Sequence, residues 1–207
     1  MSFRKLSLVA VAACACAAIV GSRISFAEDQ GGMPNMTPEM QKQMEAYMAA
    51  GMVGEQHTKL AKWVGTWSGD MTMHMPGMPS MTASQTWVVS SVFDGRFIKC
   101  DVNSEMPGMG PFVGIGFTGF DNVSQKFVST WMDSMGTGIM SGTGDLSDGD
   151  KTFTMVFETN CPVTKKVVPF REVMHFVDDK TMHVEFFGID PNTGKEMKCM
   201  ETKLTKK

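Results

Sequence analysis

The chain has 207 residues, with 19 basic and 22 acidic side chains, 22 methionines and five cysteines. Removal of an N-terminal export segment of 27 residues would leave 180 residues, enough for one domain with a substantial core. The remaining chain would carry 16 basic against 22 acidic side chains, a net charge of −6. This balance argues against nucleic acid or an anionic membrane surface as a partner, since both need a basic face.

Residues 1–27 have the layout of a secretory signal peptide. Arg4 and Lys5 precede an apolar region over residues 6–21, and Ser25-Phe26-Ala27 is a small-x-small cleavage site. The apolar run is too short for a transmembrane helix, so no stable membrane span is expected. Cys14 offers a lipoprotein alternative, but apolar residues continue beyond it, unlike in a mature N-terminus. The sequence therefore predicts an exported protein, periplasmic or secreted.

A short helical segment is expected between the signal peptide and the main domain. Residues 28–37 contain Gly and Pro and are predicted to form a flexible linker. Pro38 opens a helix with apolar side chains at helical spacing that ends at Gly51, and a second helix spans about residues 55–64. The predicted domains are thus a helical segment over 38–64 and a β-domain over 65–207.

Residues 66–207 consist of short apolar runs separated by turn signals such as Asp94-Gly95 and Asp148-Gly149. The expected strands are 66–75, 82–92, 95–105, 111–121, 125–133, 137–146, 151–160, 166–178, 181–189 and 195–206. A flat sheet of ten hairpin-linked strands would expose two long edges, which closure removes. The predicted fold is therefore all-β, an antiparallel up-and-down barrel of about ten strands. A sandwich is the alternative, although it usually needs longer crossover connections.

Methionine is concentrated in the loops expected at one end of this barrel. Successive hairpins alternate between the two ends, and a Met-Pro-Gly-Met tetrad occurs in two loops of the same end, at residues 75–78 and 106–109. The turns at the other end are tight and rich in Asp, and the preceding helix is expected to cover that end. Methionine is flexible and apolar, which suits an adaptable binding surface. The predicted rim consists of Met75, Met78, Met106, Met109 and Met135.

The same methionines allow a second interpretation. Met71, Met73, Met75, Met78 and Met81, together with His74, have the close spacing of exported Cu(I) sites, because soft thioether sulfur suits a soft ion. Strand alternation, however, points the first three of them away from the histidine. We therefore assign no metal ligand, and we retain a periplasmic soft-metal binding protein as the alternative function.

No catalytic motif is recognised. The segment Gly114-Ile-Gly-Phe-Thr-Gly119 spells a dinucleotide fingerprint, but another strand follows it, where that motif needs a helix. Its glycines are expected to relieve crowding in a barrel strand. The four histidines lack zinc spacing, and no nucleophile motif is present. The sequence predicts no catalytic residue and no cofactor, with an enzyme of unrecognised site as a further alternative.

Three cysteines, Cys100, Cys161 and Cys199, would remain after signal cleavage. Because the number is odd, at most one internal disulfide forms. A Cys161–Cys199 pair is possible, and buried free thiols are the alternative.

Two resemblances are carried by short motifs. Gly65-Thr66-Trp67, leading from a helix into the first strand, resembles the Gly-x-Trp motif of lipocalins and other calycins. From about residue 51 to 207 the chain is similar to a bacterial family of unknown function, numbered fifteen seventy-nine. The matching motifs are Gly54-Glu-Gln-His57, Gly65-Thr-Trp67, Gly95-Arg-Phe97, Pro111-Phe-Val-Gly-Ile-Gly116, Gly119-Phe-Asp-Asn122, Val128-Ser-Thr-Trp-Met-Asp133, Met135-Gly-Thr-Gly138 and Arg171-Glu-Val173.

The resemblance implies a calycin-like barrel, often exported, with no established activity. It also suggests a shared site or turn that includes Trp131, Asp133, Gly136, Thr137 and Arg171. Our leading hypothesis is a monomeric barrel that binds a small apolar or amphipathic molecule at its methionine-rich mouth. In this hypothesis the five rim methionines line the opening, Trp131 forms a wall, and Asp133 or Arg171 is the polar anchor.

Overall fold

The computed structural model describes residues 37–207. The predicted signal peptide and most of the linker lie outside these residues. Two helices, α2 (Pro38–Ala50) and α3 (Glu55–Ala61), precede ten strands. The strands are β1 (Gly65–Met73), β2 (Met81–Val92), β3 (Phe97–Met106), β4 (Gly110–Asp121), β5 (Lys126–Asp133), β6 (Met140–Ser147), β7 (Thr152–Asn160), β8 (Val167–Asp178), β9 (Thr181–Ile189) and β10 (Glu196–Lys206). Neither described helix is long and apolar enough to cross a membrane.

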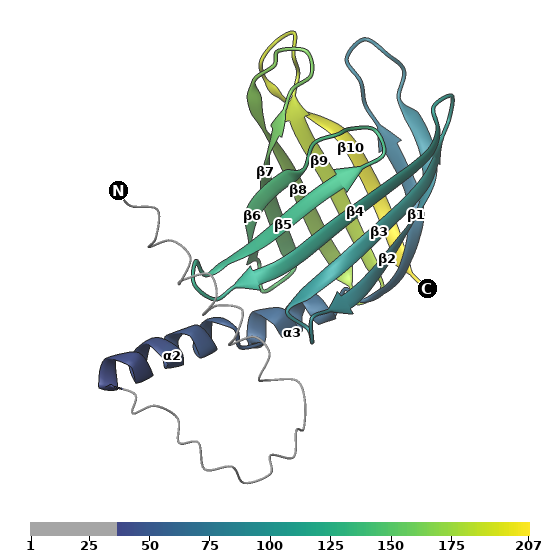
Figure 1. Ribbon diagram of the computed structural model, residues 1–207. Coiled ribbons are helices and arrows are strands. Elements are labelled where there is room, and N and C mark those ends of the chain that lie inside the picture. Colours follow the sequence, from purple (N-terminus) through teal and green to yellow (C-terminus); the bar gives the residue numbers. More distant parts are fainter. Residues whose placement is uncertain (1–36) are drawn as a thin grey trace, which may run out of the picture. The chain divides into compact units, whose positions relative to one another are not determined.

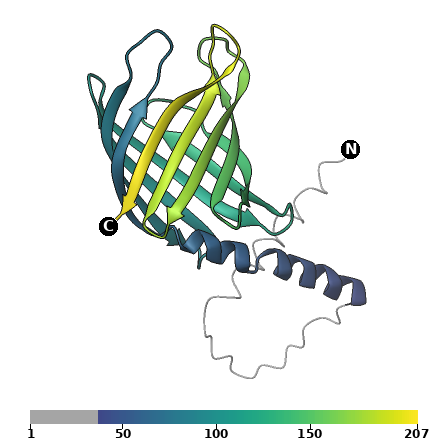
Figure 2. The same cartoon turned by 180° about the vertical axis from the view of Figure 1, so that it is seen from behind.

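The ten strands form a closed antiparallel barrel in which each strand pairs with its sequence neighbours (Figures 1 and 2). Closure comes from the pairing of β1 with β10, which runs from Trp67 opposite Lys206 to Met73 opposite Met200. The predicted up-and-down barrel is therefore confirmed. The largest difference in strand bounds is at β6, which begins at Met140, so residues 137–139 belong to the preceding loop. That loop contains Gly136 and Gly138, and glycine has a low propensity for β-strand, so the strand begins only after them.

Five loops lie together at one end of the barrel, opposite α3 (Figure 1). They are residues 74–80, 107–109, 134–139, 161–166 and 190–195. We call this the loop end, and the opposite end, where α3 lies, the helix end. The prediction that alternate hairpins share an end is confirmed by the strand order.

The helix end is sealed by a compact aromatic core. Leu60 of α3 and Trp67 of β1 are 1% and 2% exposed, and the Trp67 indole N–H donates to the Trp63 carbonyl at 2.9 Å. The Trp63 ring packs edge-on against Phe153 with 4.7 Å between ring centroids. Because α3 supplies apolar side chains to this core, it is the element that covers the end, as the sequence predicts.

The α2 helix forms as predicted, but none of its side chains is buried. The segment that follows it is held to the barrel by polar contacts. Asn122 donates from its amide to the carbonyls of Ala50 (3.1 Å) and Met52 (2.7 Å), and Arg96 donates to the carbonyl of Gly51 (3.0 Å). These bonds position the start of α3 without burying the apolar side chains of α2.

Candidate ligand-binding site

Strand register identifies the side chains that face the barrel interior, because directly paired residues lie on the same face of a sheet. One row runs from Met155 on β7 through Glu172 on β8 and Phe186 on β9 to Met200 on β10. Met155 is 1% exposed, and Phe186 and Glu172 are each 9% exposed. Glu172 therefore points into the barrel, in a row that is otherwise apolar.

The Glu172 carboxyl lies in this interior without a polar partner. Within residues 37–207 the carboxyl forms no hydrogen bond and no ion pair. Burial raises its pKa from 4.5 to about 8, because the charged form loses hydration and gains no compensating contact. At neutral pH the group is thus held mainly as the neutral acid.

Cys100 of β3 faces Glu172 across the interior. β3 and β8 are five strands apart in either direction around the ring. Burial raises the pKa of the Cys100 thiol to about 12, with smaller contributions from Glu172 and Asp101.

A polar network of the interior on β1, β2 and β10 is fully engaged. Gln85 donates to the Thr202 hydroxyl at 2.7 Å and accepts the Trp87 indole N–H at 3.0 Å. Thr202 in turn donates to the Asp70 carbonyl at 3.0 Å. This network is internally satisfied, as buried polar groups usually are. The Glu172 carboxyl, by contrast, has unused hydrogen-bonding capacity among the described residues.

Trp131 and Asp133 of β5 form a second interior feature, toward the loop end. The Trp131 indole N–H donates to Asp133 Oδ2 at 2.8 Å, and the backbone N–H of Met135 donates to Asp133 Oδ1 at 2.9 Å. The indole ring lies over β4, where a Cβ at Gly114 would be 2.2 Å from Trp131 Cζ2. Gly114 and Gly116 of the apparent dinucleotide motif thus make room for Trp131, and Gly119 makes room for Phe97, which agrees with the expected relief of crowding.

The predicted rim methionines divide into two groups. Met75, Met78, Met109 and Met135 lie in loops of the loop end and are 38%, 57%, 49% and 58% exposed. Met106 ends β3, is 7% exposed and packs in a small core cluster with Met71 and Ala83. The structure therefore places four of the five methionines at the surface of the loop end and the fifth inside the barrel.

Arg171, one of the two predicted polar anchors, is directed away from the interior. It precedes the inward-facing Glu172, and successive side chains of a strand point to opposite faces. Its guanidinium pairs with Glu196 at 2.7 Å and lies over the Phe187 ring, 3.9 Å from the centroid. The structure brings Trp131 and Asp133 together, but it does not bring Arg171 to them.

Glu172 was missed as a candidate, although the sequence carries a signal for it. The alternate residues Val168, Phe170, Met174 and Phe176 of the same strand are apolar, so Glu172 is the one charged residue on that face. A single carboxylate in the apolar series of a strand is a sign of a functional or strained position.

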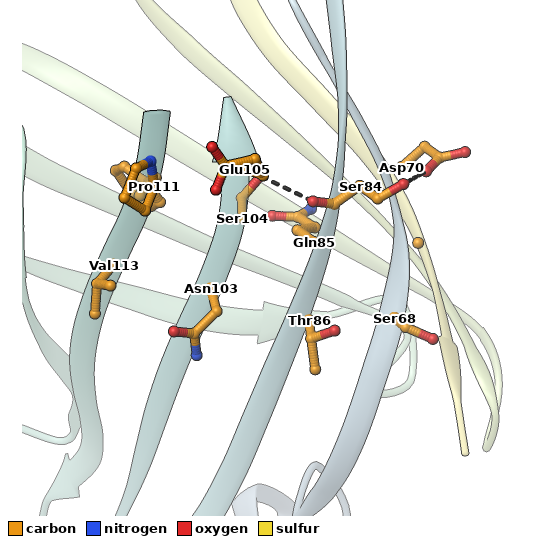
Figure 3. Close-up of a pocket in the computed structure, with 12 residues that line it drawn as sticks. Ser68, Asp70, Ser84, Gln85, Thr86, Asn103, Ser104, Glu105, Pro111 and Val113 are labelled. Carbon is orange, nitrogen blue, oxygen red and sulfur yellow. Dashed lines mark hydrogen bonds between the residues drawn. The ribbon is translucent and has the colours of Figure 1, made fainter. Parts of the chain in front are cut away.

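Two solvent-exposed grooves of the barrel have mixed polar and apolar linings. One lies over β1–β4 and is lined by hydroxyl, amide and carboxylate groups together with the apolar side chains of Pro111, Phe112 and Val113 (Figure 3). Within it the Ser84 hydroxyl donates to Asp70 at 2.7 Å and the Ser104 hydroxyl donates to the Ser84 carbonyl at 2.8 Å. A second groove over β8–β10 and β1 contains His175 and Glu185, 3.9 Å apart.

Cys100, Cys161 and Cys199 are all free thiols. The possible Cys161–Cys199 disulfide is therefore not formed. Cys199 instead lies in the β10 bulge, where its thiol donates to the Phe186 carbonyl at 3.3 Å.

The fold and its neighbours define the class of protein, a calycin-like barrel. The chain is similar to the crystal structure of Rv2717c from M. tuberculosis, with a TM-score of 0.55 and 15% identity over 75% of this chain and 99% of that one. It is also similar to the S-type phycobiliprotein lyase CPES from Guillardia theta, with a TM-score of 0.51 and 9% identity over 78% of this chain and 96% of that one. At such identities these likenesses concern the fold alone. No significant match is found among curated proteins.

Residues 53–206 match the model of the family described as "Protein of unknown function (DUF1579)". The chain belongs to this family, as its motifs predict.

Proposed function

We propose that this protein binds a small apolar or amphipathic molecule inside the loop-end half of the barrel. The observation that carries the proposal is a difference in burial between the two ends of the interior. Inward-facing residues of the helix end, such as Phe153 and Leu204, are 1% and 0% exposed. Toward the loop end, Met71, Ala83 and Met106 are buried in a small cluster. Six other inward-facing residues there are only half-buried, namely Phe112, Trp131, Asp133, Met140, Phe170 and Met200.

This difference supports a site that a ligand enters from the loop end. The half-buried side chains are mostly aromatic or sulfur-containing, and such surfaces gain free energy when a ligand displaces their water. The sealed helix end gives the site a floor. The exposed methionines Met75, Met78, Met109 and Met135 are suited to the rim, because thioether side chains adapt to ligands of different shape.

Replacing Met78, Met109 and Met135 together with Ser is expected to weaken binding of the neutral apolar probe N-phenyl-1-naphthylamine about tenfold, because three apolar contacts at the rim are lost. The melting temperature is expected to change little, since all three side chains are exposed. Fluorescence titration and thermal unfolding measure the two quantities.

The matched control replaces three exposed methionines near the helix end, Met44, Met48 and Met52, with Ser. This variant should bind the probe like the unmodified protein. Equal binding by both triple variants would remove the rim assignment. No probe binding by the unmodified protein would remove the proposed function itself.

We further propose that the protein is exported as a monomer after removal of residues 1–27. N-terminal sequencing of protein recovered from outside the cytoplasm is expected to begin at Glu28. A lipid-modified N-terminus at Cys14, or an intact Met1, would contradict this processing.

A further inference from the structure

The charged groups that face the interior toward the loop end are acidic. Among the described residues that point inward there are two carboxylates, Glu172 and Asp133, on β8 and β5. The basic side chains of the neighbouring strands are engaged elsewhere. Arg171 pairs with Glu196 on the outer face, and Lys198 pairs with Glu185 and Glu201. A ligand in this part of the barrel therefore meets negative charge or carboxylic acid, without an opposing protein cation.

The two interior carboxyl groups differ in the hydrogen bonds that their oxygens accept. Both oxygens of Asp133 accept hydrogen bonds, from the Trp131 indole and from the Met135 backbone. Glu172 has no such partner within the described residues and is 9% exposed. An unpaired carboxyl at this depth is costly unless something else satisfies it. Glu172 is therefore the interior group that a ligand would satisfy.

The surroundings of Glu172 favour a cation as that partner. Phe186 is its direct neighbour on β9, and the Phe186 and Phe170 rings stack with 6.0 Å between their centroids. Aromatic faces attract cations, and a carboxylate in a poorly hydrated site binds an ammonium more strongly than in water. An anionic ligand would instead meet like charge on Asp133 and would oppose the ionisation of Glu172.

We propose that the natural ligand is an apolar molecule carrying a basic amine, and that Glu172 binds its ammonium group. This inference rests on the proposed function and specifies its ligand class. The amine enters already protonated and stays so, while Glu172 gives up its proton to solvent, so that an ammonium–carboxylate pair forms.

Proton release follows from the state of Glu172 in the free protein, where burial raises its pKa to about 8. The flanking interior side chains on β7 and β9, Met155 and Phe186, do not titrate. The remaining inward titratable groups are the carboxyl of Asp133 and the thiols of Cys100 and Cys199, and burial raises the pKa of both thiols and keeps them neutral. Glu172 is thus the group expected to change its protonation when a cation binds near neutral pH.

The test compares three probes with the same alkyl chain: decylamine, 1-decanol and decanoate. Calorimetric titration near pH 7 is expected to show that decylamine binds at least about tenfold more tightly than decanol, with decanoate weakest. Its binding heat should differ between phosphate and Tris buffers, because these buffers take up the released proton with different enthalpies. Glu172→Gln is expected to abolish both the amine preference and the buffer dependence.

The matched control is Glu158→Gln on β7, which changes an exposed carboxylate and should keep both properties. Decanol binding as tightly as decylamine would overturn the ligand class and leave barrel binding intact. An amine preference that survives in Glu172→Gln would overturn the role of Glu172. If none of the three probes binds, the proposed function fails as well. Buffer-independent heats in the unmodified protein would contradict the proton release even if the Gln variant fails to fold.

Discussion

Replacing Glu172 with Gln is expected to stabilise the protein against unfolding near pH 8 and to have little effect near pH 4. Burial raises the pKa of Glu172 from 4.5 to about 8 in the folded state, whereas in the unfolded chain the carboxyl ionises at its ordinary pKa. Between these values the folded protein holds a proton that the unfolded chain has lost. The free energy of unfolding of the unmodified protein therefore falls as the pH rises through this window, and above about pH 8 the loss is complete.

Gln cannot ionise and avoids this loss, so the gain from the substitution should grow from about pH 4.5 to about pH 8. Its upper limit is about 5 kcal/mol, which corresponds to the full difference between the two pKa values. Urea unfolding over a series of pH values measures it. The control Glu158→Gln should show no such pH-dependent gain, because Glu158 is exposed. A gain that is the same at every pH would mean that ionisation of Glu172 is not its source.

Replacing Gly69 with Ala is expected to destabilise the barrel by about 3 kcal/mol or more. Gly69 lies on β1 opposite Leu204 of β10, in the strand pair that closes the barrel. A Cβ built there would be 1.9 Å from the carbonyl oxygen of Lys203 and 2.9 Å from its carbonyl carbon. Backbone atoms cannot rotate away as a side-chain end can, so the two strands must separate locally and lose packing and hydrogen bonds.

The matched control is Gly138→Ala, in the loop between β5 and β6. A Cβ at Gly138 would meet no heavy atom within 4 Å, and the residue does not need a positive φ. Thermal unfolding of the two variants should therefore differ by many degrees, with Gly69→Ala the less stable. Equal melting temperatures would show that the β1–β10 pairing tolerates the added methyl group, which contradicts a tight closure at this position.

These two substitutions distinguish a residue needed for strand packing, Gly69, from a residue whose effect depends on ionisation, Glu172. Gly69 serves the close approach of two strands, and its replacement should lower stability at every pH. Glu172 lowers stability only above the pH at which it ionises in the unfolded chain, and this is the cost expected of a residue kept for binding. If a cationic ligand binds there, it should also protect the folded state of the unmodified protein more than that of Glu172→Gln.

The strands and the sharing of loop ends could be predicted from the sequence, because both depend on local features. Alternation of side chains with a period of two and turns such as Asp94-Gly95 mark each hairpin, and hairpin order then decides which loops lie at the same end. The pairing of Trp131 with Asp133 is also local, since residues two apart on a strand share a face. The closeness of α3 to the first strand likewise follows from the short connection between them.

The tertiary structure decided which face of each strand became the interior and how deep each side chain lies. On β8 the apolar series Val168, Phe170, Met174 and Phe176 singles out Glu172, but the other face also carries apolar residues such as Val173. The pattern therefore marks Glu172 as unusual without deciding that its face is the interior one. Met106 was predicted at the rim with the loop methionines, but its position at the end of β3 buries it against Met71 and Ala83. The sequence by itself determined the strands and the ends at which their loops meet. Only closure of the barrel decided that the Glu172 carboxyl is buried and that its pKa is raised, because strands from distant parts of the chain surround it and exclude water.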